Sequence, residues 1–227
     1  MLPIGVIIPT LNSMPYLPAH VAGVMTWADL VQEIIVVDSF STDGTMEYLR
    51  RHLRHPKLRF LSHPPGLYAS WNYGIAQLRT PYTYIATVGD TATRHGLEHL
   101  SAAAERLQCD VCMSQPRFID AEGRELQDIR WPIHNMVEHL RITAPRALKQ
   151  AEVLFYAVTS GGNSVLGSSA SNLYRSAVLQ KKPFPTEFES AGDTAWGLLH
   201  CCDATFGVTS QRCANFLCHP RQPNGKE

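Results

Sequence analysis

The first half of the chain repeats one pattern, a short continuous apolar run followed by a longer amphipathic segment. The clearest runs are residues 4–9 and 33–38, which are rich in β-branched side chains. Such runs are typical of strands buried on both faces, as in parallel sheets covered by helices. The same reasoning predicts strands at 58–62, 82–88 and 111–114, with helices at 17–27, 45–53, 68–78 and 97–107. The pattern therefore predicts an α/β fold with a mostly parallel central sheet flanked by helices.

The pattern changes after Ser114. Two short runs, 117–120 and 125–129, flank a turn and predict a small antiparallel hairpin. Beyond it we expect helical segments at 134–151, from Tyr174 onward and at 193–202, and a late strand at 204–208. We predict one domain over residues 1–227, ending in a polar tail at 219–227.

Composition excludes some classes of protein. Lys plus Arg and Asp plus Glu both number 20 in 227 residues, and a chain with no basic excess is not expected to bind nucleic acid. The sequence contains no stretch of about 18 apolar residues, so we predict no membrane-spanning helix. The N-terminus lacks a signal-peptide pattern, and with six cysteines this predicts reduced thiols and a cytoplasmic location.

The two common phosphate-binding loops are absent. No G-x-G-x-x-G follows the first strand and no G-x-x-x-x-G-K-[ST] occurs, which argues against a dehydrogenase or a P-loop enzyme. Ligands of parallel sheets bind beyond the carboxyl ends of the strands. Polar residues follow four predicted strands, at 9–12, 38–39, 63–66 and 89–91, so we expect a cleft at that edge of the sheet.

Two motifs at a characteristic separation carry a family resemblance. Residues 6–12 (Val-Ile-Ile-Pro-Thr-Leu-Asn) and 33–45 (Glu-Ile-Ile-Val-Val-Asp-Ser-Phe-Ser-Thr-Asp-Gly-Thr) resemble the opening of family 2 glycosyltransferases, which have the GT-A fold. The resemblance continues through the Asn-x-Gly-Ile helix at 66–75 and returns at 170–175 and 192–196. It is strong over residues 4–100 and patchy beyond.

The resemblance implies a hexosyltransferase in which residues 1–114 bind the nucleotide sugar and 115–218 bind the acceptor. The implied donor is a UDP-sugar, with GDP- and dTDP-sugars left open. The implied acceptor is a glycan or a lipid-linked glycan, as in polysaccharide biosynthesis. Peripheral association with the inner face of a membrane belongs to the same expectation.

The resemblance also implies roles for individual residues. Pro9, Thr10 and Asn12 would line the nucleoside pocket, and the Asp38 carboxylate would accept hydrogen bonds from the base or ribose. The helix at 66–75 would add further contacts to the nucleotide, from Tyr68 and Asn72.

Two carboxylates would carry the chemistry. Asp90 matches the family's metal-binding Asp-x-Asp, and a divalent cation there (Mn²⁺ or Mg²⁺) would stabilise the charge that develops on a diphosphate leaving group. Asp193 matches the base that takes the proton of the acceptor hydroxyl, in a direct displacement that inverts the anomeric centre. The segment 86–91 holds a single acid where the family shows two or three, so His219 is considered as a second metal ligand.

Two alternatives stay open. A decayed transferase that only binds nucleotide or glycan is favoured by the single acid at Asp90 and opposed by the presence of Asp38 and Asp193. A sugar-1-phosphate nucleotidyltransferase would need a Gly-rich, basic loop after the first strand. Residues 9–16 contain no Gly, Lys or Arg, which argues against it.

Overall fold

One nine-stranded sheet organises the computed structural model, which describes residues 1–161 and 163–218. The order along the sheet is β3-β2-β1-β4-β8-β6-β9-β5, and β7 pairs with β9. The strands are β1 (Ile4–Thr10), β2 (Glu33–Asp38), β3 (Leu58–Ser62), β4 (Tyr82–Ile85), β5 (Thr91–Ala92), β6 (Val111–Ile119), β7 (Arg146–Ala147), β8 (Asn172–Arg175) and β9 (Phe206–Leu217). The predicted tail at 219–227, including His219, lies outside the described residues.

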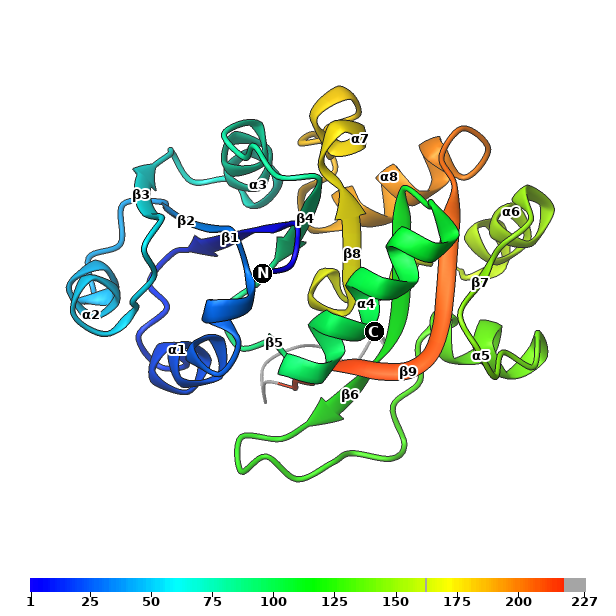
Figure 1. Ribbon diagram of the computed structural model, residues 1–227, viewed down its shortest axis with the longest axis horizontal. Helices are drawn as coiled ribbons and strands as arrows, with labels where there is room; N and C mark the ends of the chain where they lie inside the picture. The colour runs from blue at the N-terminus through cyan, green and yellow to red at the C-terminus, as the bar shows by residue number, and fades with distance from the viewer. Residues whose placement is uncertain (162, 219–227) are drawn as a thin grey trace.

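Four of the eight strand pairings are parallel, and these are the longer ones, so most paired residues of the sheet are in parallel register. Strands β3, β2, β1 and β4 form a parallel set, and β6 pairs in parallel with β9. Strand β8 lies antiparallel between β4 and β6, and it joins the two sets into one curled sheet (Figure 1). The predicted α/β class with a mostly parallel sheet is confirmed.

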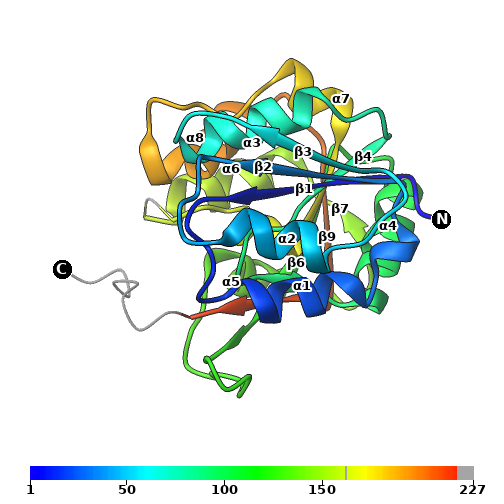
Figure 2. The same cartoon turned by 90° about the vertical axis from the view of Figure 1, so that its left-hand side faces the viewer.

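Helices cover both faces of the sheet (Figures 1 and 2). Side chains of β1 alternate between two cores, with Val6 and Ile8 in one and Ile7 in the other. The first core is closed by α1 (Leu17–Met25), α2 (Thr45–His52) and α4 (Arg94–Leu107). The second is closed by α3 (Leu67–Ala76), α5 (Pro132–His139), α6 (Gln150–Thr159), α7 (Ser176–Lys181) and α8 (Gly192–His200).

The predictions for the second half need three corrections. The hairpin is reduced to a single bridge between Ile119 and Glu125, because β6 runs through to Ile119 and pairs with the end of β9. The segment at 134–151 is two helices, α5 and α6, separated by β7. The residues around Tyr174 form strand β8, and the helix starts only at Ser176.

The six cysteines are free thiols, and most are buried. No helix among residues 1–161 and 163–218 is long and apolar enough to cross a bilayer.

Candidate active site

Strands β1 and β4 separate at the carboxyl edge of the sheet. Their pairing ends where Ala86 N donates to Ile7 O (2.9 Å). Pro9 is the next residue of β1 whose backbone nitrogen faces the β4 side, and proline has no hydrogen to donate there. On its other side β1 stays paired, and Ser39 N donates to Thr10 O (2.9 Å). Thr10 therefore lies at the edge where the first two strands end together.

Asp38 ends β2 and is held by three hydrogen bonds. Its carboxylate accepts from Thr10 Oγ1 (3.0 Å), from Ser41 N (3.0 Å) and from Ser41 Oγ (2.6 Å). Only 4% of the residue is exposed. The carboxylate is therefore fixed in direction before any ligand arrives.

The loop after β1 is fastened to the loop after β2. Asn12 has a left-handed backbone (φ 46°), and its Oδ1 accepts from Thr42 N (2.9 Å). Asp43 is structural, because its carboxylate accepts from Met14 N (3.0 Å) and Thr45 N (3.0 Å). These contacts bring the predicted Pro9, Thr10, Asn12 and Asp38 together at one edge.

Two other predicted nucleotide contacts are engaged elsewhere. The Asn72 amide both donates to Phe184 O (2.7 Å) and accepts from Phe184 N (2.9 Å). Tyr68 is buried, and its hydroxyl has two acceptors within reach, Ser190 O (3.2 Å) and the Asp193 carboxylate. Both side chains tie α3 to the segment that leads into α8, and their contact with a nucleotide stays a prediction.

Asp90 is a buried carboxylate that accepts three hydrogen bonds from three segments. Leu217 N donates to Oδ1 (3.0 Å), and the hydroxyls of Thr87 (3.2 Å) and Ser168 (3.3 Å) donate to Oδ2. Burial raises the pKa of Asp90 to about 7, an effect that these donors only partly offset. At neutral pH the carboxyl is therefore close to half protonated, and a bound cation would favour the charged form.

Asp193 lies in the first turn of α8 and on the wall of a cavity of about 290 Å³. Its Oδ1 accepts from Thr194 N (2.7 Å). Burial raises the pKa of Asp193, and the hydroxyls of Tyr68 and Ser164 partly offset that shift by hydrogen bonding to the carboxylate. A weakly solvated carboxylate with a raised pKa is suited to taking a proton.

Gly192 allows this arrangement. A Cβ at this position would lie 2.4 Å from the Tyr68 ring and 2.6 Å from Pro185 O, so α8 could not approach α3 with any larger residue.

One short segment connects the two catalytic candidates. Ser164 and Gly167 line the Asp193 cavity, and Ser168, the next residue, donates to Asp90. The structure thus brings Asp90 and Asp193 to opposite ends of residues 164–168. Sequence reasoning missed these serines, because the only signal at this position is the high content of Gly and Ser over residues 160–171.

Trp131 is the aromatic wall of the same cavity. Trp196, the other tryptophan near Asp193, does not line this cavity, because it is fully buried in the core and donates to Lys182 O (2.7 Å). Trp131 was missed because it lies in a stretch without secondary-structure periodicity.

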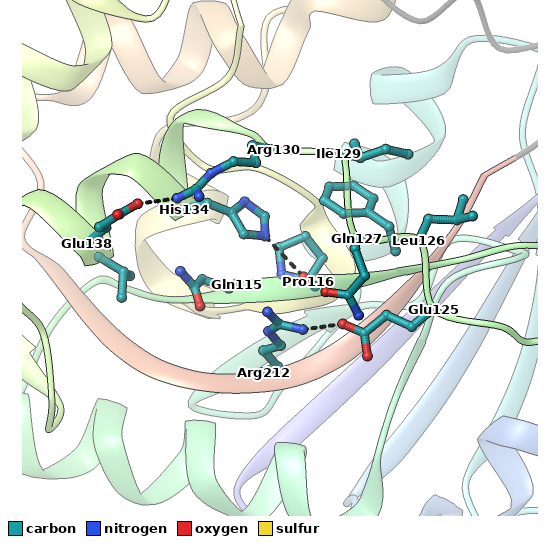
Figure 3. A pocket seen from close by; sticks show the side chains of 12 residues that line it. Gln115, Pro116, Glu125, Leu126, Gln127, Ile129, Arg130, His134, Glu138 and Arg212 are labelled. Atoms are coloured by element: carbon teal, nitrogen blue, oxygen red, sulfur yellow. Dashed lines mark hydrogen bonds and ion pairs between the residues drawn. The ribbon is translucent and has the colours of Figure 1, made fainter.

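A further cavity of about 260 Å³ lies between α5, residues 125–130 and Arg212 (Figure 3). Arg212 points to Glu125 and Arg130 to Glu138, so these cations are already paired. His134 Nε2 faces Pro116 O (3.3 Å). None of the predicted site residues lines this cavity.

The surroundings of Asp90 offer a divalent cation oxygen ligands of the right type, but only a few of them. No group of three His, Cys, Asp or Glu side chains suited to a metal occurs in the described part of the chain. Asp90 with the hydroxyls of Thr87 and Ser168 is a hard oxygen set, which suits Mg²⁺ or Mn²⁺ when phosphate oxygens complete the shell. His219 cannot be placed, since it lies outside the described residues.

The model of glycosyl transferase family 2 matches residues 5–162. The chain belongs to this family. None of the curated proteins compared with the chain matches it significantly.

Solved structures show the same fold. The chain superposes on Staphylococcus aureus TarS 1–349 with a TM-score of 0.69 at 20% identity, covering 94% of this chain and 60% of that one. The same fragment in complex with UDP-GlcNAc gives 0.68 at 18% identity, covering 96% and 59%. The chain thus spans about 60% of the TarS fragment and 37% of the longer TarS chain.

Proposed function

We propose that this chain transfers a sugar from a nucleoside-diphosphate sugar to a hydroxyl of an acceptor. One observation carries the proposal: the half-buried Asp193 carboxylate faces a cavity and is joined through residues 164–168 to Asp90. Family membership supports the reaction class, and the TarS complex with UDP-GlcNAc supports a UDP-sugar as donor.

In the proposed reaction the acceptor oxygen attacks the anomeric carbon from the Asp193 side. A bond forms between that oxygen and the carbon, and the bond from the carbon to the diphosphate oxygen breaks. The electron pair leaves with the diphosphate, and the proton passes to the Asp193 carboxylate. A single displacement of this kind inverts the anomeric centre.

The donor would lie along the edge formed by Pro9, Thr10, Asn12 and Asp38. Asp38 would accept hydrogen bonds from the base or ribose, since its orientation is already fixed by Thr10 and Ser41. Asp90, with Thr87 and Ser168, would hold a divalent cation. That cation would neutralise charge on the diphosphate.

The acceptor is proposed to be a glycan or a lipid-linked glycan. Its hydroxyl would enter beside Trp131, because an aromatic wall and nearby polar side chains are suited to a sugar ring. Polysaccharide biosynthesis, a cytoplasmic location and peripheral membrane association complete the proposal.

The test is thermal stabilisation by UDP, GDP, CMP and dTDP, each with and without Mn²⁺. A ligand at about 100 times its Kd adds about 2.7 kcal/mol to the free energy of unfolding, a visible shift in Tm. We expect a manganese-dependent shift with UDP that Asp38→Asn reduces. No shift with any nucleotide would contradict the donor site.

A non-catalytic nucleotide-binding module is the second candidate, and the single acid at Asp90 favours it. It predicts the same shift with UDP but no release of UDP from a UDP-sugar under any condition. Turnover that Asp193→Asn abolishes would exclude it.

A further inference from the structure

Helix α6 is apolar on both of its faces. Its inner face buries Val153, Tyr156 and Ala157. Its outer face carries Leu154, Phe155 and Val158, which are 42%, 57% and 65% exposed. A helix that is apolar all round is normally covered on every side. The outer face of α6 therefore needs an explanation that packing within the described chain does not supply.

The neighbouring helix extends this face. Gln150 Nε2, at the start of α6, donates to Cys202 O (2.8 Å), just beyond the end of α8. Asn163 and Asp193, beyond the other end of α6 and at the start of α8, line one cavity. The two helices are thus neighbours that run in opposite directions.

Helix α8 adds two exposed leucines. Leu198 and Leu199 are 44% and 63% exposed, in the half of α8 that lies beside the start of α6. We call the five side chains of the two helices the α6–α8 face: Leu154, Phe155, Val158, Leu198 and Leu199.

The α6–α8 face is continuous with the cavity system of the candidate active site. Phe155 also lines a cavity of about 340 Å³. This cavity shares Trp131, Pro132 and Asn163 with the cavity that contains Asp193. A path of mixed lining, with Phe155 and Trp131 beside polar side chains such as Asn163, therefore leads from the exposed helices to the proposed base.

The charges around α6 suit a lipid surface better than an acidic or basic protein patch. Its one acidic residue, Glu152, is paired with Arg146 (2.9 Å). Lys149, immediately before the helix, is exposed and makes no ion pair with the described residues. An exposed apolar face beside an unpaired cation is suited to the interface of a bilayer that contains anionic lipids.

We propose that the α6–α8 face docks on a lipid bilayer and that the acceptor is lipid-linked, with its hydroxyl reaching Asp193 along this path. This inference rests on the proposed function for the role of Asp193. It names the acceptor class and the surface that selects it. The lipid would remain in the bilayer against Leu154, Val158 and Leu199, while the polar headgroup enters the cavity past Phe155.

The first experiment is sedimentation with phosphatidylcholine vesicles, with and without phosphatidylglycerol. The test variant is L154Q/V158Q/L199Q, which leaves Phe155 and every proposed site residue intact. The matched control is M25Q, an exposed apolar residue at the end of α1 on another part of the molecule. We expect the triple variant to lower the vesicle partition coefficient about tenfold or more, and the control to leave it unchanged.

Binding of UDP separates this inference from the proposed function. Both variants should keep the thermal shift with UDP and Mn²⁺, which also reports that they are folded. Loss of vesicle binding with an unchanged UDP shift supports the docking face. Wild-type protein that binds no vesicles overturns the inference but leaves the donor site standing.

Two other results would also overturn it. Equal vesicle binding by wild type and triple variant would mean that another surface contacts the lipid. A concentration-dependent dimer that the triple variant abolishes, measured by analytical ultracentrifugation, would assign the face to a second copy of the chain.

Discussion

The two edges of the candidate site hold their carboxylates in opposite ways. Asp38, on the donor edge, accepts three hydrogen bonds from neighbouring loops. Asp193, on the acceptor edge, accepts from Thr194 N in its own helix turn and from the hydroxyls of Tyr68 and Ser164, yet burial still raises its pKa. The first arrangement fixes the direction of an acceptor of hydrogen bonds, whereas the second leaves a carboxylate ready to take a proton. In the proposed mechanism, this difference assigns donor binding to the first edge and proton transfer to the second.

The largest expected effect separates the two edges by function. Asp193→Asn keeps the shape of the side chain but removes the proton acceptor, so turnover should fall about a thousandfold. The UDP-induced shift in Tm should stay unchanged. Release of UDP from the UDP-sugar, measured with saturating donor, checks the first statement. A turnover within a few-fold of wild type would remove Asp193 as the base.

Asp38→Asn tests the donor edge. It replaces one accepting oxygen by a donor, and the Kd for UDP should rise about tenfold to a hundredfold. Isothermal titration calorimetry measures it. Asp43→Asn is the matched control, because this carboxylate bonds only Met14 and Thr45 and should affect stability alone. Equal Kd changes in both variants would mean that Asp38 acts only by shaping the loop.

Asp90→Asn should stabilise the ligand-free protein at alkaline pH. Because the pKa of Asp90 is raised from 3.8 to about 7, the folded state binds more protons than the unfolded state between these values. Stability therefore falls as pH rises through this window, and an uncharged side chain avoids the loss. We expect a gain of about 1 kcal/mol at about pH 8, and a smaller gain at about pH 5.

Thermal unfolding across pH measures this gain. The same variant should lose the manganese-dependent part of the UDP shift. A Tm that drops equally at both pH values would instead make Asp90 a purely structural acceptor for Leu217.

The smallest effect concerns the pH profile of turnover. The proposed mechanism requires ionised Asp193, so kcat/KM should fall as pH drops through its raised pKa. The Tyr68 hydroxyl stabilises the ionised form, and Tyr68→Phe should move this limb upward by about half a pH unit. Tyr174→Phe is the control, since that hydroxyl accepts from Asn172. A limb at the same pH in all three proteins would exclude the hydrogen bond from Tyr68.

The position of the donor edge could be predicted from the sequence because its residues lie at the ends of neighbouring strands. Thr10 and Asp38 end adjacent parallel strands, and the apolar runs that predict those strands also fix where they end. The family resemblance then implied roles for residues that this strand pairing places close together.

The contacts of the other site residues were harder to predict from the sequence, for physical reasons. Asp90 receives its donors from Ser168 and Leu217, which are distant in sequence and lie in segments without clear periodicity. Asn72 and Tyr68 matched a motif, but their side chains form hydrogen bonds with the backbone of Phe184 and Ser190. Such long-range contacts depend on how the second half folds back on the first, which local patterns do not specify.

The segment at 164–168 has a consequence for redesign. It lines the wall that would meet the acceptor at Ser164 and supports the diphosphate side at Ser168. An engineer who grafts a new loop here to change what is glycosylated would also alter how the leaving group is held. A change in this segment would therefore affect the choice of acceptor and the reaction rate together. A graft that keeps Ser168 and varies the residues before it is the way to change the choice of acceptor alone.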